Sequence, residues 1–305
     1  MPNSTLRNHL IQRLGLDSRN MGFAAPRIVE VEDYLGWQIE HLIFRAGNGT
    51  GEDIPAYFLR PQTGHRPVPA LVYVHAHGNN YQIGGVELTA GRPALQGPYA
   101  PDLVRAGIAA LSFDLPAFGA RQHPTEAARA KAHLWQGQTL FGQMLAELMT
   151  AVDFLGAHPA VAADRIGALG FSMGSTLAWW LAALDTRIRA TSASCSFADL
   201  ASLVATGEHD RHGIYMTVPG LLPLARSGQI AGLAAPRALQ ICVGLQDWST
   251  PKAAFDLARV DLERAYQTVS TVEQLQFHVE PTSGHVVTTE MRAAVLEFLM
   301  GALID

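Results

Sequence analysis

The stretch Ile166–Leu177, which reads IGALGFSMGSTL, decides how this chain is expected to fold. Its first part, up to Phe171, is the short apolar run of a buried parallel strand, and the residues after Gly174 have the pattern of a helix. Ser172 must therefore turn the chain from strand to helix within one residue, which strains its backbone and leaves room only for glycine two positions before and after it. Strain of about 1–3 kcal/mol is rarely kept without a use. The pattern predicts a nucleophilic serine, although Gly-x-Ser-x-Gly also occurs by chance.

Composition and charge narrow the range of functions. Of the 305 residues 48% are hydrophobic and 16% charged, so the chain can build a core and shows no sign of disorder. A formal net charge of −5 and a pI near 6.2 give no reason to expect nucleic-acid binding. The N-terminal segment lacks the apolar core of a signal peptide, and no run approaches the roughly 18 apolar residues of a membrane span. We expect a cytoplasmic protein outside the membrane, with Cys195 and Cys242 as buried free thiols.

Helix and strand patterns alternate along the rest of the chain. A weak amphipathic helix is expected over residues 4–14, followed by three antiparallel strands joined by hairpins. From residue 70 onward apolar strands alternate with helices, which predicts an α/β fold with right-handed crossovers, a mostly parallel central sheet and helices on both faces. The expected antiparallel strands are Arg27–Asp33, Trp37–Arg45 and Ile54–Arg60, and the expected parallel strands are Ala70–His75, Ile108–Leu115, Ile166–Phe171, Ile188–Cys195, Ala238–Gly244 and Leu275–Val279. The expected helices cover residues 100–106, 139–157, 173–184, 251–266 and 288–303.

The alternation is interrupted once, between residues 197 and 236. This segment contains three Pro and two His without a clear strand, and open α/β sheets bind their ligands at the carboxyl ends of the strands. We expect residues 197–236 to form a cap inserted into a single domain of residues 1–305, with an N-terminal helical extension over residues 1–26. The apolar part, residues 212–222, either lines a pocket for the acyl or alcohol group of a substrate or forms the interface of a homodimer.

Two further residues could activate the serine. His285 and Asp247 each follow a predicted parallel strand, so both are expected at the same sheet edge as Ser172. The order Ser, Asp, His is that of one large group of hydrolases. Taken singly, Asp247 could cap a helix or close a turn, and His285 could be a surface-loop histidine. The coincidence of all three favours a catalytic triad with Ser172 as nucleophile, His285 as base and Asp247 as the acid that orients it.

The oxyanion of an acyl-transfer intermediate needs backbone N–H donors. Met173 directly follows the serine at a helix N-terminus and is expected to supply one. The second is expected from the loop after Ala70–His75, with the Asn79 amide favoured and Gly78 as the alternative. The residues expected to contact substrate are His77, Gly78, Tyr215 and Trp248.

A metal site is the competing interpretation of several histidines. His75 and His77 could join donors on the cap, which are Glu208, His209, Asp210 and His212. Such a site would require two distant segments to converge, and His77 already belongs to the predicted oxyanion loop. We therefore expect no metal.

Five segments resemble the dienelactone-hydrolase and acetyl-xylan-esterase-like serine esterases of the α/β-hydrolase superfamily. They are HAHGNN (75–80), FDLPAFGAR (113–121), GFSMGS (170–175), APRALQICVGLQDWSTP (235–251) and SGH (283–285). The resemblance extends from about Trp37 to the C-terminal end and implies the α/β-hydrolase fold and the same triad as above. It also implies that Asp114, Gly119 and Arg121 form a turn that braces the floor of the active site. Dienelactone hydrolases proper use a cysteine nucleophile, so Ser172 favours ordinary ester hydrolysis.

These observations lead to one expected function. The chain is expected to cleave a small-molecule carboxylic ester through an acyl-enzyme intermediate, without a metal or organic cofactor. A C–C bond hydrolase, an amidase or an acyltransferase would use the same triad and is the first alternative. A non-catalytic binding module is the second, and such modules usually lack a member of the triad.

Overall fold

The computed structural model describes residues 3–16, 23–47, 51–62 and 66–304. Its centre is a nine-stranded sheet in the order β1-β2-β3-β5-β4-β6-β7-β8-β9. The antiparallel strands at one edge are β1 (Phe23–Tyr34), β2 (Trp37–Ala46) and β3 (Asp53–Pro61), and β3 pairs antiparallel with β5. The parallel strands are β4 (Val68–Val74), β5 (Ala109–Phe113), β6 (Val161–Phe171), β7 (Ile188–Ser194), β8 (Ala238–Gly244) and β9 (Leu275–Glu280). The predicted α/β fold with a mostly parallel sheet is confirmed.

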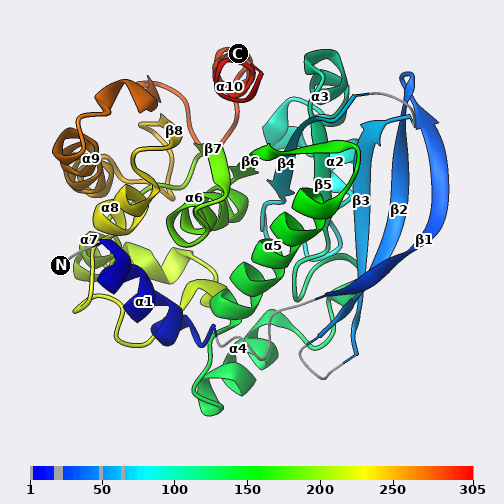
Figure 1. Cartoon of the computed structure of the whole chain (residues 1–305). Coiled ribbons are helices and arrows are strands. Elements are labelled where there is room, and N and C mark those ends of the chain that lie inside the picture. Colours follow the sequence, from blue (N-terminus) through cyan, green and yellow to red (C-terminus); the bar gives the residue numbers. More distant parts are fainter. Residues whose placement is uncertain (1–2, 17–22, 48–50, 63–65, 305) are drawn as a thin grey trace.

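Helices cover both faces of the sheet (Figure 1). In Figure 1, α3 and α10 lie above the sheet, and α5 and α6 lie below it. The helices are α1 (Asn3–Leu14), α2 (Glu87–Ala90), α3 (Ala100–Ala106), α4 (Glu126–Trp135), α5 (Leu140–Ala157), α6 (Met173–Leu184), α7 (Leu200–Thr206), α8 (Ser227–Ala231), α9 (Lys252–Thr268) and α10 (Thr289–Leu303).

The central strands are apolar throughout because both faces are covered. In β4, Val72 and Val74 belong to the core on the side of α5 and α6, whereas Leu71 and Tyr73 belong to the core on the side of α3 and α10. This alternation follows the two-residue period of a strand. Cys195 and Cys242 are free and buried, as predicted.

Two parts of the fold differ from the prediction. Among the described residues of the N-terminal extension over residues 1–26, the helix covers Asn3–Leu14, whereas β1 begins at Phe23 and pairs with β2 as an edge strand. Residues 1–2 and 17–22 of that extension lie outside the described residues. Helix α4 was not predicted, although Thr125 before it is an N-cap whose side chain accepts a hydrogen bond from Ala128 N.

The segment 197–236 connects β7 to β8 through α7, α8 and three short 3-10 turns. No strand occurs within it, and all of its residues are described. Its position before the strand that leads to Asp247 is the predicted one, and its role as a cap stays a prediction.

Helix α5 is long and apolar enough to cross a membrane by length and composition, contrary to the expectation that no run approaches that length. However, 67% of its residues are buried inside the protein, and α5 packs against β6 and α6.

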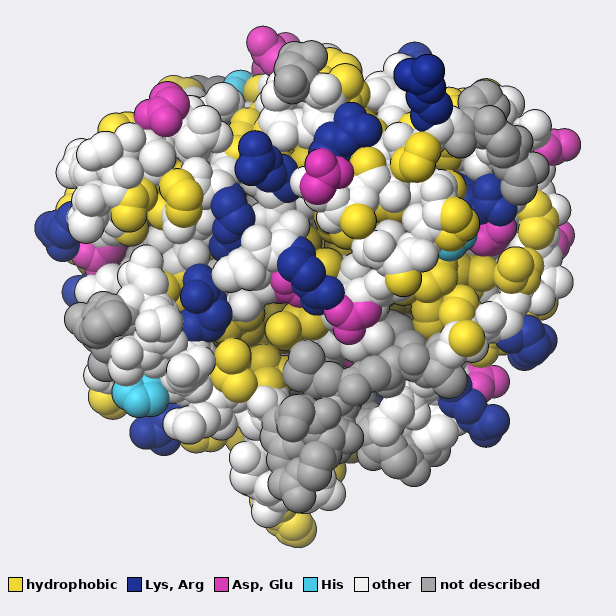
Figure 2. Space-filling model, in the orientation of Figure 1, with side chains coloured by type: hydrophobic (Ala, Val, Ile, Leu, Met, Phe, Trp, Pro, Cys, Tyr) yellow, Lys and Arg dark blue, Asp and Glu magenta, His cyan; other side chains and the backbone are white. Residues whose placement is uncertain are grey.

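The space-filling view shows basic and acidic side chains distributed among apolar ones over the visible face (Figure 2).

Candidate active site

Strand β6 and helix α6 meet at Ser172, whose backbone is strained. Its φ of 59° and ψ of −120° are unusual for a residue with a side chain. A Cβ added at Gly170 would lie 2.1 Å from Gly174 O, and one added at Gly174 would lie 1.9 Å from Val74 O. Both obstacles are backbone atoms, so only glycine fits at either position, as predicted.

Three predicted residues come together at the carboxyl ends of β6, β8 and β9. His285 Nε2 lies 2.9 Å from Ser172 Oγ, and His285 Nδ1 lies 2.9 Å from both carboxylate oxygens of Asp247. Asp247 is buried, and an ionised carboxylate can only accept hydrogen bonds, so Nδ1 carries the proton. His285 Nε2 is therefore the acceptor for the Ser172 hydroxyl, which is the arrangement that a general base requires.

Ser249 contacts both Asp247 and His285, and the sequence analysis did not predict this role. Its hydroxyl and its N–H both donate to Asp247 Oδ1, at 2.8 and 2.7 Å. A serine two residues after an aspartate commonly makes such a local turn, and that spacing was the available signal. These bonds fix the carboxylate that orients His285.

The N–H groups of the loop after β4, which is expected to supply the second oxyanion donor, differ in their hydrogen bonds. Asn79 N–H, the predicted donor, is already bonded to His77 Nδ1 at 3.0 Å. The preceding carbonyl, Ala76 O, accepts from Arg92 at 3.0 Å, and in a trans peptide the next N–H, that of His77, points the opposite way. Within the described residues neither His77 N–H nor Met173 N–H has a hydrogen-bond acceptor. His77 N–H is therefore a free donor of this loop, and Gly78 N–H, the alternative from the sequence, also has no acceptor among the described residues.

A cleft of about 250 Å³ opens onto Ser172 and His285. All four residues predicted to contact substrate line it, and these are His77, Gly78, Tyr215 and Trp248. Trp248 is 40% exposed at this cleft, whereas Tyr215 is buried. The segment 197–236 also supplies Arg211 and His212, which the sequence analysis did not assign to substrate contact.

A second, smaller cavity adjoins the cleft. Its volume is about 30 Å³, and it shares Ser196, His212 and Ser249 with the cleft. The rest of its wall is mainly apolar and comes from α5, α6 and the segment 197–236, as in Phe141, Trp179, Trp180, Met216 and Leu221. Trp179 and Trp180 are buried, as expected of core residues.

Comparisons with known proteins identify the family of this chain. The model of the dienelactone hydrolase family matches residues 54–197. The protein YtaP of Bacillus subtilis (strain 168) is 34% identical over 296 residues, which cover 96% of this chain and 97% of YtaP. This chain belongs to the dienelactone hydrolase family. The resemblance predicted from the sequence is thereby confirmed.

Solved structures place this dienelactone hydrolase family member in the α/β-hydrolase fold. Methylesterase BT1017 superposes with a TM-score of 0.75 at 19% identity, over 98% of this chain and 63% of that chain. The glucuronoyl esterase from Solibacter usitatus gives a TM-score of 0.69 at 14% identity, over 99% and 92%. At these identities the likeness concerns the fold, and it confirms the predicted fold class.

The histidines considered as metal ligands make other contacts in this family member. Within residues 3–16, 23–47, 51–62 and 66–304, no three His, Cys, Asp or Glu side chains are grouped to hold a metal. His77 Nε2 contacts Glu126, and His75 Nε2 accepts from Leu115 N–H at 3.2 Å.

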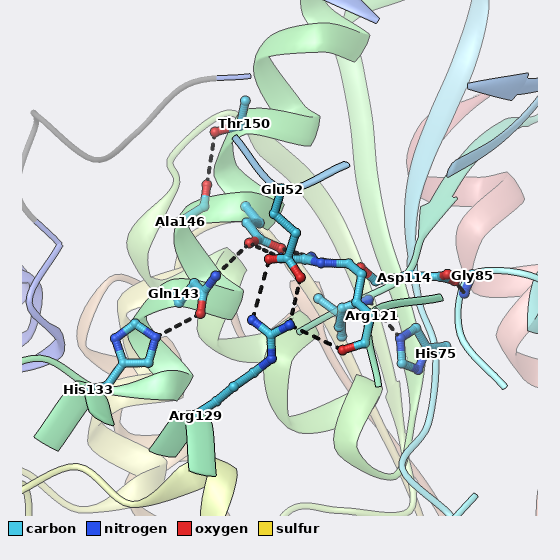
Figure 3. Close-up of polar contacts among 12 residues, drawn as sticks. Glu52, His75, Gly85, Asp114, Arg121, Arg129, His133, Gln143, Ala146 and Thr150 are labelled. Atoms are coloured by element: carbon cyan, nitrogen blue, oxygen red, sulfur yellow. Dashed lines mark hydrogen bonds and ion pairs between the residues drawn. The ribbon is translucent and has the colours of Figure 1, made fainter. Parts of the chain in front are cut away.

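The turn after β5 has the form that the resemblance implied (Figure 3). Asp114 accepts from Gly85 N and Ala120 N, both at 2.8 Å, and a Cβ at Gly119 would collide with its carboxylate. Arg121 donates to Asp114 O at 2.9 Å and extends to two glutamates described below. The turn lies directly under the loop that carries His75, because Leu115 N–H donates to His75.

His75 is expected to make stability depend on pH. Burial lowers its pKa to about 3, whereas the unfolded chain binds a proton at about 6.5. The unfolded state therefore gains a proton first as pH falls, and this residue lowers the free energy of unfolding by up to about 1.4 kcal/mol per pH unit below 6.5. His75→Gln keeps an acceptor for Leu115 N–H without titrating. Urea unfolding from pH 7 to pH 4.5 should show the stability deficit of the variant shrinking towards acid, and a constant deficit would contradict the assignment.

Proposed function

We propose that this chain hydrolyses carboxylic esters through an acyl-enzyme formed on Ser172. The observation that carries the proposal is the continuous hydrogen-bonded path from Ser172 through His285 to Asp247, with each step at 2.9 Å. Membership of the dienelactone hydrolase family and the α/β-hydrolase fold support a carboxylic ester hydrolase. A serine at the nucleophile position favours esters over the chemistry of a cysteine nucleophile.

The proposed reaction has two halves. His285, oriented by Asp247, removes the proton of Ser172 as the hydroxyl attacks the ester carbonyl, and the oxyanion accepts hydrogen bonds from Met173 N–H and His77 N–H. The C–O bond of the ester then breaks, and the alcohol leaves with the proton from His285. A water molecule, deprotonated by His285, attacks the acyl-enzyme, and Ser172 regains its proton as the acid departs.

We further propose that the small cavity beside the cleft receives the acyl group. It is mainly apolar, and it lies next to Ser249 and His212 at the base of the cleft. A volume of about 30 Å³ is enough for the methyl group of an acetyl ester but not for a long chain. This chain should therefore favour esters of short acids.

Hydrolysis of p-nitrophenyl acetate, butyrate and octanoate tests both statements. The wild type should hydrolyse the acetate ester fastest, hydrolyse the butyrate ester more slowly and reject octanoate. Leu221→Ala, which removes a buried side chain from the cavity wall, should raise kcat/KM for octanoate relative to acetate about tenfold. Leu103→Ala, in the core on the opposite face of the sheet, is the matched control and should leave that ratio unchanged. A wild type that prefers octanoate would exclude the small cavity as the acyl site.

A further inference from the structure

We propose that Glu126 on α4 is a positioning residue that sets the tautomer of the His77 ring and thereby aims the oxyanion loop at Ser172. The inference rests on the proposed function and assigns a role to a residue outside the triad. Glu126 lies at the first position of α4 and is 4% exposed. It is 49 residues from His77 in the sequence and 89 from the cap residue that it also binds.

Glu126 accepts hydrogen bonds from two sides of the cleft. Its Oε2 lies 2.7 Å from both His77 Nε2 and Tyr81 Oη, and its Oε1 accepts from Tyr215 N at 2.9 Å. Burial disfavours the charge, but the bonds from His77 and Tyr81 outweigh it and lower the pKa of Glu126. The oxyanion loop and the cap therefore share one ionised carboxylate.

The contacts of the His77 ring determine which nitrogen carries its proton. Nδ1 accepts from Asn79 N–H at 3.0 Å, so Nδ1 is unprotonated. Nε2 must then carry the hydrogen, and it donates to Glu126. Glu126 thus stabilises the one tautomer that lets the ring bind Asn79 N–H.

The bond from Asn79 N–H holds an unfavourable loop conformation. Gly78 has a φ of 55° and Asn79 a φ of 50°, and the second value is uncommon for a residue with a side chain. If Nδ1 were protonated, it would repel Asn79 N–H and release this turn. The adjacent peptide, whose N–H belongs to His77, would then lose its direction towards Ser172.

The start of helix α4, which carries Glu126, is held in place by the contacts of Arg129. One turn along the helix, Arg129 donates to Glu52 at 2.6 Å and to the carbonyls of Arg121 and His123 at 3.2 and 3.1 Å. Figure 3 shows Arg129 between Glu52 and the backbone of Arg121. The start of α4 is therefore tied to the same turn that supports the floor of the site.

A glutamine at position 126 cannot reproduce these contacts, because an amide offers one oxygen and one NH2. If the oxygen faces Tyr215 N–H, the NH2 faces the His77 ring. The ring must then accept at Nε2, move its proton to Nδ1, and lose Asn79 N–H. If the oxygen faced His77, the NH2 would meet Tyr215 N–H, and these two donors would repel each other in a buried position. The first orientation avoids this repulsion by a shift of one ring proton, so we expect the first orientation.

Nitrogen-15 spectra of the histidine side chains test the inference without requiring activity. The wild type should show His77 protonated at Nε2 and unprotonated at Nδ1, and the signal is identified by its absence in His77→Asn. In Glu126→Gln the proton should move, at least in part, to Nδ1. A wild-type ring protonated at Nδ1, or an unchanged tautomer in Glu126→Gln, would overturn the inference. Because the spectra do not depend on turnover, they separate this result from a failure of the proposed function.

Kinetics of a double-mutant cycle test the consequence for catalysis. Glu126→Gln should lower kcat about 100-fold with less than about a threefold change in KM. In His77→Asn the amide oxygen takes the place of Nδ1 as acceptor for Asn79 N–H, so a further Glu126→Gln should change kcat less than about threefold. Equal losses in both backgrounds would show that Glu126 does not act through the His77 ring. Tyr81→Phe removes a donor to the same oxygen and should keep kcat within about threefold, whereas a 100-fold loss there would contradict the proposal.

Discussion

Replacing Ser172 with alanine is expected to lower kcat for ester hydrolysis by about 10⁴-fold or more. The reason is geometric, since the hydroxyl is the atom 2.9 Å from His285 Nε2 and faces the cleft. The backbone around it should not change, because an alanine fits the same strained conformation. Activity on p-nitrophenyl acetate and capture by a fluorophosphonate should both be lost, while the urea unfolding midpoint stays near that of the wild type.

His285→Ala should produce a loss of similar size, and the double variant should be little worse than either single variant. The two groups act as one unit, so removing the second costs little once the first is gone. Independent losses that multiply would indicate that Ser172 and His285 serve separate steps. Wild-type activity in Ser172→Ala would contradict the proposed mechanism.

Arg121→Met is expected to lower the free energy of unfolding by about 3–5 kcal/mol. The guanidinium is 1% exposed and donates to Glu147 at 2.7 and 2.9 Å and to Glu52 at 2.8 Å. Burial opposes its charge, but these carboxylates outweigh the burial and raise the pKa of Arg121 above its ordinary value. Removing the guanidinium leaves Glu147 buried with an uncompensated charge, which is far more costly than losing a surface pair.

Urea unfolding of Arg121→Met and of Arg264→Ala compares the free energy lost with a buried ion pair to that lost with an exposed one. Arg264 pairs with Asp261 at 3.1 Å but is 68% exposed, so its loss should cost no more than about 1 kcal/mol. Comparable losses in the two variants would mean that the Arg121 network adds no more than a surface pair does. Arg121→Met should also weaken activity at temperatures near its lowered midpoint, because the turn that it braces contacts His75.

The fold and the grouping of Ser172, Asp247 and His285 could be predicted because each depends on local pattern. Buried parallel strands have continuous apolar sequences, and the strand-to-helix turn at Ser172 needs glycine on both sides. Asp247 and His285 could be found because residues that follow parallel strands meet at one edge of the sheet. The family assignment confirms the resemblance on which the wider prediction rested, whereas the catalytic roles await the variants above.

Contacts between distant loops could not be predicted. The choice between Asn79 and His77 as oxyanion donor depends on the His77 ring, which accepts a hydrogen bond from Asn79 N–H in the same loop. Glu126 contacts that ring from α4, a helix that the sequence pattern did not indicate. Helix α4 was missed because its sequence, EAARAKAHLW, has only two large apolar residues, Leu134 and Trp135, and both lie at its C-terminal end. The N-cap at Thr125 is the other local signal. Pairings of this kind are fixed by tertiary packing, which periodicity does not record.

The division of the cleft between two kinds of segment has a consequence for how its selectivity can change. The reacting groups stand on strand ends within the main sheet, whereas Arg211, His212 and Tyr215 come from one continuous insertion. Substitutions within that insertion can reshape the cleft while the path from Ser172 to Asp247 stays intact. The contact between Glu126 and Tyr215 limits which insertions can be exchanged. A replacement must still place a backbone N–H where Tyr215 N–H now donates to Glu126. Variants with other substrates can therefore be built by exchanging residues 197–236 while Glu126 is kept.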